Sequence, residues 1–173
     1  MNYLYRFRGA AYQLTDFEEP YLYHVTYAKH LPSIIGLGLV PQGAGEDSGF
    51  SILSSDYAKG YVFLSEDGAT PIWAEFLNMG ASVQSGYIPV LLRIPLAELD
   101  LDLLEEDEIG SRDVPEGRAF RTKQIIPSAR IQIWAPEGHF VPVHSVTPQE
   151  FIDRAAEVSD EAEDVLNLFV PYW

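Results

Sequence analysis

The sequence of 173 residues contains no cysteine. This absence excludes disulfide bonds, cysteine-ligated zinc sites and thiol nucleophiles from the chemistry available to the chain. A composition without cysteine suits a reducing compartment, and we therefore expect a cytoplasmic protein.

Long apolar runs are missing as well. No stretch of about 18 or more consecutive apolar residues occurs, so the sequence predicts no membrane-spanning helix. The first ten residues, MNYLYRFRGA, carry arginines but no apolar core after them, and we expect no secretory signal. Hydrophobic residues still make up 47% of the chain, which is enough for a single folded domain over residues 1–173.

Basic residues are scarce, with 11 Lys and Arg against 26 Asp and Glu, for a net charge of -15. Such a surface repels the phosphates of nucleic acids unless a local basic patch overrides it. Several of the bases cluster between Arg112 and Arg130, and acids cluster at 98–108 and 150–164. The acidic runs favour solvated faces, and the alternative is an acidic surface that docks a basic protein partner.

Familiar catalytic motifs are absent. The sequence has no H-E-x-x-H, P-loop, G-x-G-x-x-G or G-x-S-x-G pattern. The four histidines, at positions 24, 30, 139 and 144, are scattered, so we expect no metal site.

Apolar periodicity and turn signals divide the chain into short elements. Strands are predicted at 21–26, at 61–65, at 87–96, as a short strand within RAFRTKQII at 118–126 before a turn at Pro127, at 130–134 and at 139–146. Helices are predicted at 30–35, ended by Gly36 and Gly38, at 66–79, and behind a capping box at Thr147-Pro-Gln-Glu150. The last helix is expected to bury Phe151, Ala155 and Val158, followed by Val165, Leu166 and Phe169. Residues 42–60 are predicted as a long loop, and the overall pattern favours an α+β fold.

The stretch YLYHVT at 21–26 places a histidine within a strand of apolar and aromatic residues. Taken alone, His24 is a polar residue satisfied inside the core. The alternative is that its imidazole contacts a ligand, which the neighbouring segments address.

The stretch LYHVTYAKHLPSIIGLGLVPQ resembles the first motif of the ADP-ribosyltransferase superfamily. YVFLSEDGATPIWAEF resembles the second segment of that superfamily, and its residue pattern is most similar to the RNA 2′-phosphotransferase branch. IPVLLRIPLAELDLD and FRTKQIIPSARI resemble the next strand and the closing strand. The resemblance spans residues 20–134 and implies a split mixed or antiparallel β-sheet with short flanking helices, followed here by a C-terminal helical segment at 147–170.

The resemblance implies an NAD site around the first motif. His24 would donate a hydrogen bond to a ribose hydroxyl, Val25 would hold the nicotinamide amide through its backbone, and Thr26 would support the pocket. An aromatic ring would stack on the nicotinamide, where Phe63 aligns best and Tyr61 lies two residues earlier on the same strand face.

Three further residues complete the implied cofactor site. Ser65 ends the aromatic strand, Trp73 would close the pocket from the following helix, and Arg121 is the cation for the NAD pyrophosphate. Core packing remains the alternative for the aromatic side chains, and pairing with the acidic runs remains the alternative for the arginines.

The closing strand departs from the pattern of the transferases. Members of the superfamily usually place a glutamate there, which stabilises the oxocarbenium-like centre as nicotinamide leaves. Ala119 occupies that position, and Glu116 is the nearest carboxylate in the sequence. The RNA 2′-phosphotransferase branch has a small apolar residue there, but the acidic balance of this chain argues against a large RNA substrate.

Two hypotheses follow from these observations. The first is an NAD-dependent ADP-ribosyltransferase or related phosphotransferase, with NAD as substrate, His24 and Glu116 as catalytic residues, and a protein or nucleotide acceptor. Small domains of this kind are often toxins, effectors or phage-borne modifiers. The second is a catalytically inactive member of the same fold, which binds a basic protein through its acidic surface.

Overall fold

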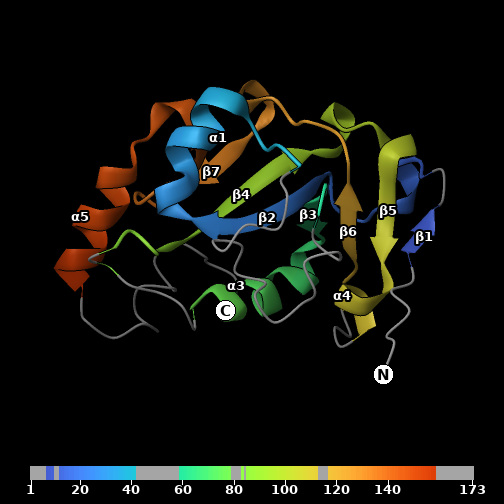
Figure 1. The fold of residues 1–173 in the computed structure, drawn as a ribbon, viewed down its shortest axis with the longest axis horizontal. Helices are drawn as coiled ribbons and strands as arrows, with labels where there is room; N and C mark the ends of the chain where they lie inside the picture. Colours follow the sequence, from blue (N-terminus) through green and yellow to red (C-terminus); the bar gives the residue numbers. More distant parts are fainter. Residues whose placement is uncertain are drawn as a thin grey trace.

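The computed structural model describes residues 7–9, 12–41, 59–78, 83, 85–112 and 117–158. Within these ranges, eight strands form one antiparallel sheet in the spatial order β1-β5-β6-β3-β2-β4-β7-β8 (Figure 1). The strands are β1 (Phe7–Gly9), β2 (Tyr21–Tyr27), β3 (Val62–Ser65), β4 (Pro89–Pro95), β5 (Leu104–Asp107), β6 (Ala119–Thr122), β7 (Gln132–Trp134) and β8 (Phe140–Pro142). The α+β prediction is confirmed.

Helices flank the sheet on both faces. They are α1 (Leu31–Leu37), α3 (Thr70–Asn78), α4 (Glu108–Arg112) and α5 (Pro148–Val158). Leu31 and Ile34 of α1 join the main buried cluster, and so do Phe151 and Ala155 of α5. Helix α3 packs on the opposite face, where Ala74 lies in a second cluster.

Alternation along β2 explains how one strand serves both faces. Leu22 belongs to the main cluster, whereas Tyr23 belongs to the cluster under α3, because successive strand residues point to opposite sides. The hydroxyl of Tyr27 donates to the carbonyl oxygen of Leu77 in α3 at 2.7 Å, which fixes the helix against the strand.

Strand β4 lies in the middle of the sheet, as its apolar sequence predicts. Val90, Leu91 and Leu92 are each 0% exposed, and β4 pairs with β2 on one side and β7 on the other. A strand that is covered on both faces is apolar throughout rather than alternating.

The sheet divides between β2 and β3. Strands β2 and β4 stay paired from Tyr21–Pro95 to Tyr27–Pro89, whereas within the described residues β2 and β3 share the single register pair Tyr23–Ser65. Figure 1 shows β2 and β4 running obliquely while β5 and β6 stand nearly upright. The two halves are therefore β2-β4-β7-β8 and β3-β6-β5-β1.

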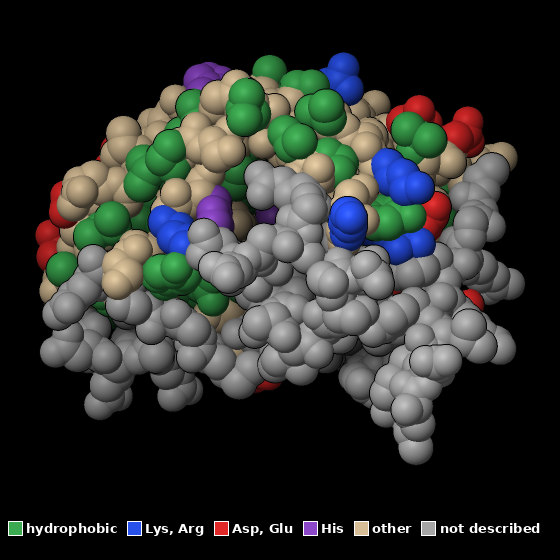
Figure 2. Space-filling model, in the orientation of Figure 1, with side chains coloured by type: hydrophobic (Ala, Val, Ile, Leu, Met, Phe, Trp, Pro, Cys, Tyr) green, Lys and Arg blue, Asp and Glu red, His purple; other side chains and the backbone are tan. Residues whose placement is uncertain are grey.

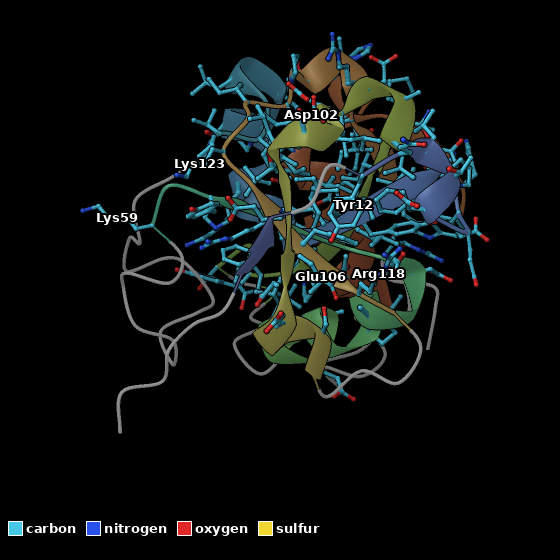
Figure 3. The ribbon with its side chains drawn as sticks, turned by 90° about the vertical axis from the view of Figure 1, so that its right-hand side faces the viewer. Tyr12, Lys59, Asp102, Glu106, Arg118 and Lys123 are labelled. Atoms are coloured by element: carbon cyan, nitrogen blue, oxygen red, sulfur yellow. The ribbon has the colours of Figure 1, made fainter. Side chains whose placement is uncertain are left out.

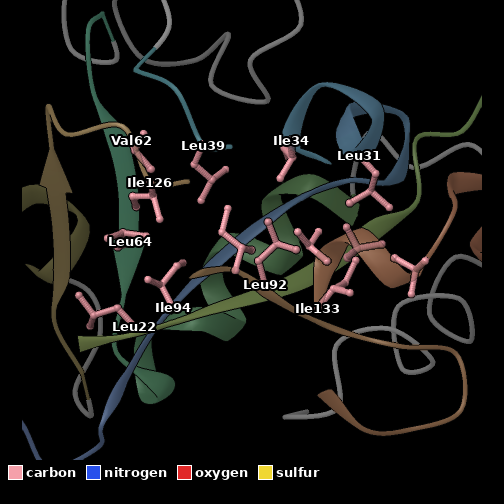
Figure 4. Close-up of a cluster of buried hydrophobic side chains, with 14 of the residues drawn as sticks. Leu22, Leu31, Ile34, Leu39, Val62, Leu64, Leu92, Ile94, Ile126 and Ile133 are labelled. Atoms are coloured by element: carbon pink, nitrogen blue, oxygen red, sulfur yellow. The ribbon is translucent and has the colours of Figure 1, made fainter. Parts of the chain in front are cut away.

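The segment after α1 connects these halves on the core side. Leu39 and Ile126 exchange backbone hydrogen bonds of 2.9 Å, and their side chains lie near Val62 in the core (Figure 4). Gly38 has a φ of 82°, and a Cβ there would lie 2.1 Å from the carbonyl oxygen of Ile126. Only glycine fits this position. Gly36, by contrast, lies inside α1, so the prediction that both glycines end the helix is wrong.

The acidic run 98–108 is exposed at Glu98, Asp100, Asp102 and Glu108, as expected, but not throughout. The sequence favours a solvated face, but β5 runs through it and Asp107 is 0% exposed. Strand β5 pairs with β6 over Leu104–Asp107, and the ion pair between Glu105 and Arg121 stabilises this pairing.

Helix α3 begins four residues later than predicted. The carbonyl oxygen of Glu66 accepts from the backbone amides of Ala69 and Thr70, so a 3-10 turn over Asp67–Ala69 precedes the helix. The α1 prediction of 30–35 is likewise shifted, since a 3-10 turn over Ala28–His30 leads into Leu31–Leu37.

The last predicted strand, at 139–146, is longer than the observed one. Strand β8 ends at Pro142, and a 3-10 turn over Val143–Ser145 follows, in which the Ser145 hydroxyl donates to the Pro142 carbonyl oxygen. The backbone amide of Thr147 donates to Glu150 at 2.5 Å, one half of the predicted capping box. Val158 is 36% exposed, so its predicted burial is wrong, and residues 165–169 lie outside the described part.

Candidate functional site at the division of the sheet

His24 lies where the two halves of the sheet separate. Its Nδ1 atom is 2.7 Å from the carbonyl oxygen of Phe63 in β3. A carbonyl oxygen can only accept, so Nδ1 carries the proton in this contact. The side chain of His24 thus supplies a link between β2 and β3 beyond the point at which their backbones remain paired.

The protonation state of His24 follows from its surroundings. Burial lowers the pKa of His24 below its ordinary value of 6.5, the Phe63 hydrogen bond opposes this shift, and nearby His30 adds to the lowering. The ring is therefore neutral at pH 7, with its proton on Nδ1. Nε2 then carries a lone pair, and no described residue donates a hydrogen bond to it.

The other two residues of the first motif separate onto different faces of β2. Thr26 shares the face of Leu22 and His24, where it is partly exposed. Val25 lies on the opposite face and packs against the cluster that contains Tyr23 and Ala74. Its side chain is thus a packing residue, and only its backbone is available for the role that the resemblance implies.

Tyr61, Phe63 and Arg121 are brought together on the other half of the sheet. Phe63 pairs with Arg121 in the β3–β6 register, and the Arg121 guanidinium lies 3.7 Å from the centre of the Tyr61 ring. Arg121 is 8% exposed, and its Nε donates to Glu105 at 2.9 Å. The predicted cation is therefore next to the predicted aromatic residues, already paired with a carboxylate.

These side chains do not share a strand face with His24. The Tyr23–Ser65 pair places Ser65, Phe63 and Tyr61 on the face that carries Tyr23, whereas His24 points to the other side of β2. The two groups meet through the Phe63 carbonyl oxygen.

The structure describes the side chain of Ser65 but not that of Trp73. Ser65 is 2% exposed, and its hydroxyl is 2.9 Å from that of Thr70, which itself donates to the Glu66 carbonyl oxygen. These bonds fix the turn into α3, so Ser65 has a structural role. Trp73 lies within α3, but its side chain is outside the described part.

The structure brings a carboxylate to the closing strand from an unexpected direction. Ala119 begins β6, is 0% exposed and pairs with Ser65. Glu116 lies outside the described residues. Next to Ala119, the backbone amide of Arg118 donates to Glu66 at 2.7 Å, and the guanidinium of Arg118 contacts the same carboxylate at 2.6 Å. Sequence reasoning missed Glu66 because it lies 52 residues before Arg118 and meets it only through the pairing of β3 with β6.

A second acid follows immediately. The Oδ1 atom of Asp67 is buried and has no hydrogen-bond partner among the described residues. Burial raises the pKa of Asp67 above its ordinary value of 3.8, and the charge of Glu19 raises it further. A buried carboxylate oxygen without a donor is uncommon in proteins, which makes Asp67 a functional candidate that sequence reasoning also missed.

Two features are absent from the part of the chain that the structure describes. No helix there has the length and apolarity needed to span a membrane. No group of three or more His, Cys, Asp or Glu side chains there has the geometry of a metal site.

Comparison of the chain with protein-family models, with curated proteins and with solved structures found no match. The functional argument therefore rests on the geometry. His24, a neutral histidine with an acceptor nitrogen, lies at the division on one face of the sheet. Tyr61, Phe63 and Arg121 lie on the opposite face of the neighbouring half, joined to His24 through the Phe63 carbonyl oxygen.

Proposed function

We propose that the protein is an ADP-ribosyltransferase-like enzyme that transfers ADP-ribose from NAD to an acceptor not identified by the sequence. The observation that carries this proposal is the position of His24, held by the Phe63 carbonyl oxygen at the division of an antiparallel sheet. The division falls between the two strands whose sequences resemble the first two motifs of that superfamily. An ADP-ribosyltransferase-like split sheet is part of the same proposal.

The role of His24 is more specific than the resemblance alone implies. Because Nδ1 donates to Phe63 and the ring is neutral, Nε2 accepts a hydrogen bond from a ribose hydroxyl rather than donating one. The ring orientation is fixed by the protein before the ligand arrives, which reduces the entropy lost on binding.

The chemistry breaks the glycosidic bond between nicotinamide and the ribose C1′. Nicotinamide leaves as a neutral base, positive charge develops on the sugar, and the acceptor bonds C1′ and releases its proton. A carboxylate stabilises this developing charge. Glu116 is the sequence candidate, and Glu66 and Asp67 are the candidates within the described residues.

Calorimetric titration with NAD tests the binding half of this proposal. We expect saturable binding that weakens by about tenfold or more in His24→Ala, since one hydrogen bond to the sugar is lost. His144→Ala is the matched control, because His144 is exposed in the turn after β8. Absence of binding to the wild-type protein at millimolar NAD would refute the enzyme proposal.

A second function is favoured by the state of Glu66. Its carboxylate is engaged by the amide and the guanidinium of Arg118, which reduces its capacity to stabilise a cationic centre. With alanine at position 119 and a net charge of -15, an inactive binding module for a basic protein is the alternative. That alternative predicts association with polylysine that weakens as salt rises, together with no binding of NAD.

A further inference from the structure

Arg93 of β4 lies among aromatic side chains on the face of the sheet that carries Tyr23. Its guanidinium carbon is 4.1 Å from the centre of the Tyr21 ring and 3.8 Å from the centre of the Phe140 ring. Its Nε atom donates to the side-chain oxygen of Gln132 at 2.7 Å. We call the group of Tyr21, Arg93, Gln132, Trp134 and Phe140 the Arg93 platform.

Strand pairing brings the Arg93 platform together from β2, β4, β7 and β8. Arg93 pairs with Tyr23 on one side and with Gln132 on the other. Trp134 pairs with Phe140, and their rings meet edge to face at 5.1 Å. Because His24 points to the other side of β2, the platform is separate from the candidate site at the division of the sheet.

The guanidinium of Arg93 is held in place without a ligand. Aromatic rings from strands on either side of β4 flank it, and Gln132 accepts the Nε hydrogen. The terminal nitrogens, Nη1 and Nη2, donate to no acceptor within the described residues. This edge of arginine binds a carboxylate through two parallel hydrogen bonds, and a side chain already held in place loses little entropy on binding.

Arg93 differs from the other arginines whose side chains the structure describes. Ion pairs join Arg118 to Glu66, Arg121 to Glu105, Arg130 to Glu98 and Arg154 to Glu157. Arg118 also lies near Glu106 (Figure 3). Arg93 forms no ion pair within the described residues, although acids outnumber bases by 26 to 11 in this chain. Its charge is therefore not balanced locally.

The rings around Arg93 are not fully covered. Helix α3 packs on β2 and β4, whereas Tyr21, Trp134 and Phe140 remain partly exposed. Tyrosine, tryptophan and arginine supply much of the binding energy at protein interfaces, where they form the well-packed centre of the contact. The exposed edge of a guanidinium beside apolar rings suits a carboxylate that is itself flanked by an apolar side chain.

We infer that the Arg93 platform docks a peptide segment of a partner protein that presents one Asp or Glu beside an apolar side chain. The carboxylate accepts from Nη1 and Nη2 of Arg93, and the apolar neighbour packs on Trp134 and Phe140. The rest of the partner is neutral or basic, because a net charge of -15 repels a strongly acidic one. Figure 2 shows Asp and Glu side chains towards both ends of the visible face. This inference goes beyond the proposed function and does not require NAD.

The test is a selection of binding peptides from a random library displayed on phage, with the full chain as bait. The selected peptides are synthesised and titrated by calorimetry without NAD. We expect them to share an Asp or Glu next to an apolar residue, and replacement of that acid by its amide should weaken binding by about tenfold or more. Arg93→Gln should have a similar effect, and the two changes together should cost little more, because they remove the same contact.

Two variants serve as controls. Arg130→Gln removes the same charge from an exposed ion pair and should change the peptide affinity by less than about twofold. Arg93→Lys keeps the charge but not the two parallel hydrogen bonds, so it should weaken binding nearly as much as Arg93→Gln. A melting curve checks the fold of the Arg93 variants, and the change of acid to amide in the peptide tests the contact with the protein unaltered.

Three outcomes would overturn the inference. One is a selection that yields no binding peptide or yields peptides without a shared acid. Another is an equal effect of Arg93→Gln and Arg130→Gln, which would mean that net charge alone governs binding. The third is tighter binding when phosphoserine replaces the acid of the peptide, which would assign the platform to phosphopeptides instead.

Discussion

The Nδ1 atom of His24 and the carbonyl oxygen of Phe63 lie 2.7 Å apart, across the line where the antiparallel sheet divides. The two ring nitrogens of His24 therefore have different roles. Its Nδ1 edge joins two halves of the fold, and its Nε2 edge is the acceptor that we propose for a ligand. The choice between a core histidine and a ligand-binding histidine is not exclusive.

Mutation can separate the structural role of Nδ1 from the proposed ligand-binding role of Nε2. Asparagine offers an N–H near the position of Nδ1 but nothing near Nε2. His24→Asn should therefore keep most of the stability and lose NAD binding. His24→Ala should lose NAD binding and also about 1–2 kcal/mol of the free energy of unfolding, because the Phe63 carbonyl oxygen loses its donor. Urea denaturation together with NAD titration of both variants measures the two effects, and equal stability of the two variants would contradict the structural role.

The lowered pKa of His24 predicts how stability depends on pH. Below pH 6.5, His24 is protonated more readily in the unfolded chain than in the folded chain. Protonation therefore stabilises the unfolded state, and the free energy of unfolding falls as the pH decreases. This contribution is fully present above pH 6.5. The difference in melting temperature between the wild type and His24→Asn should therefore shrink between pH 7.5 and 5. A constant difference over that range would show that the imidazole titrates normally in the folded protein.

Gly36 inside α1 and Gly38 immediately after it give a matched pair. Gly38→Ala should destabilise the protein by about 2 kcal/mol or more, since φ is 82° and the new Cβ would meet the Ile126 carbonyl oxygen. Gly36→Ala should be neutral or stabilising by up to about 1 kcal/mol, because it lies inside a helix with open space around it. Thermal melts measure the stability of the two variants. A comparable fall in melting temperature for both would contradict the close approach of Gly38 to the Ile126 carbonyl oxygen.

Asp67 gives a prediction of opposite sign to that of His24. Its folded pKa is raised, so its contribution to stability is fully present below pH 3.8 and is lost as the pH rises through the folded pKa. Asp67→Asn cannot ionise and should be more stable than the wild type at pH 7. The gain should not exceed about 1 kcal/mol, because partial exposure screens the charge. Chemical denaturation at pH 7 and at pH 3, below the ordinary pKa of 3.8, measures this gain, which should vanish at the lower pH.

Local sequence signals predict much of this fold but not its acidic contacts. The strands at β2 and β4 follow from runs of aromatic and branched residues, whose burial needs little knowledge of the partner strands. Strand β5 has the sequence LEED, which no propensity favours as a strand. It pairs with β1 on one side and β6 on the other, and Glu105 contacts Arg121 of β6, relationships that exist only after the strands align. Glu66 was not predicted for the same reason, because its contact with Arg118 depends on the register of β3 with β6.

Glu66 is the acid by which the two proposed functions can be distinguished. If it stabilises the cationic sugar, Glu66→Gln should leave NAD affinity within about twofold and lower the rate of nicotinamide release by about a hundredfold, as for loss of one electrostatic contact made in the transition state. Glutamine retains an oxygen that can accept from the Arg118 amide, so the fold should persist, and a melting curve checks this. Nicotinamide released from NAD, with water as acceptor, is measured by chromatography under single-turnover conditions. An unchanged rate in Glu66→Gln would leave Glu116 or Asp67 as the required carboxylate. NAD binding without nicotinamide release in the wild type would instead favour the inactive module, because the Arg118 ion pair would then hold Glu66 away from the ligand permanently.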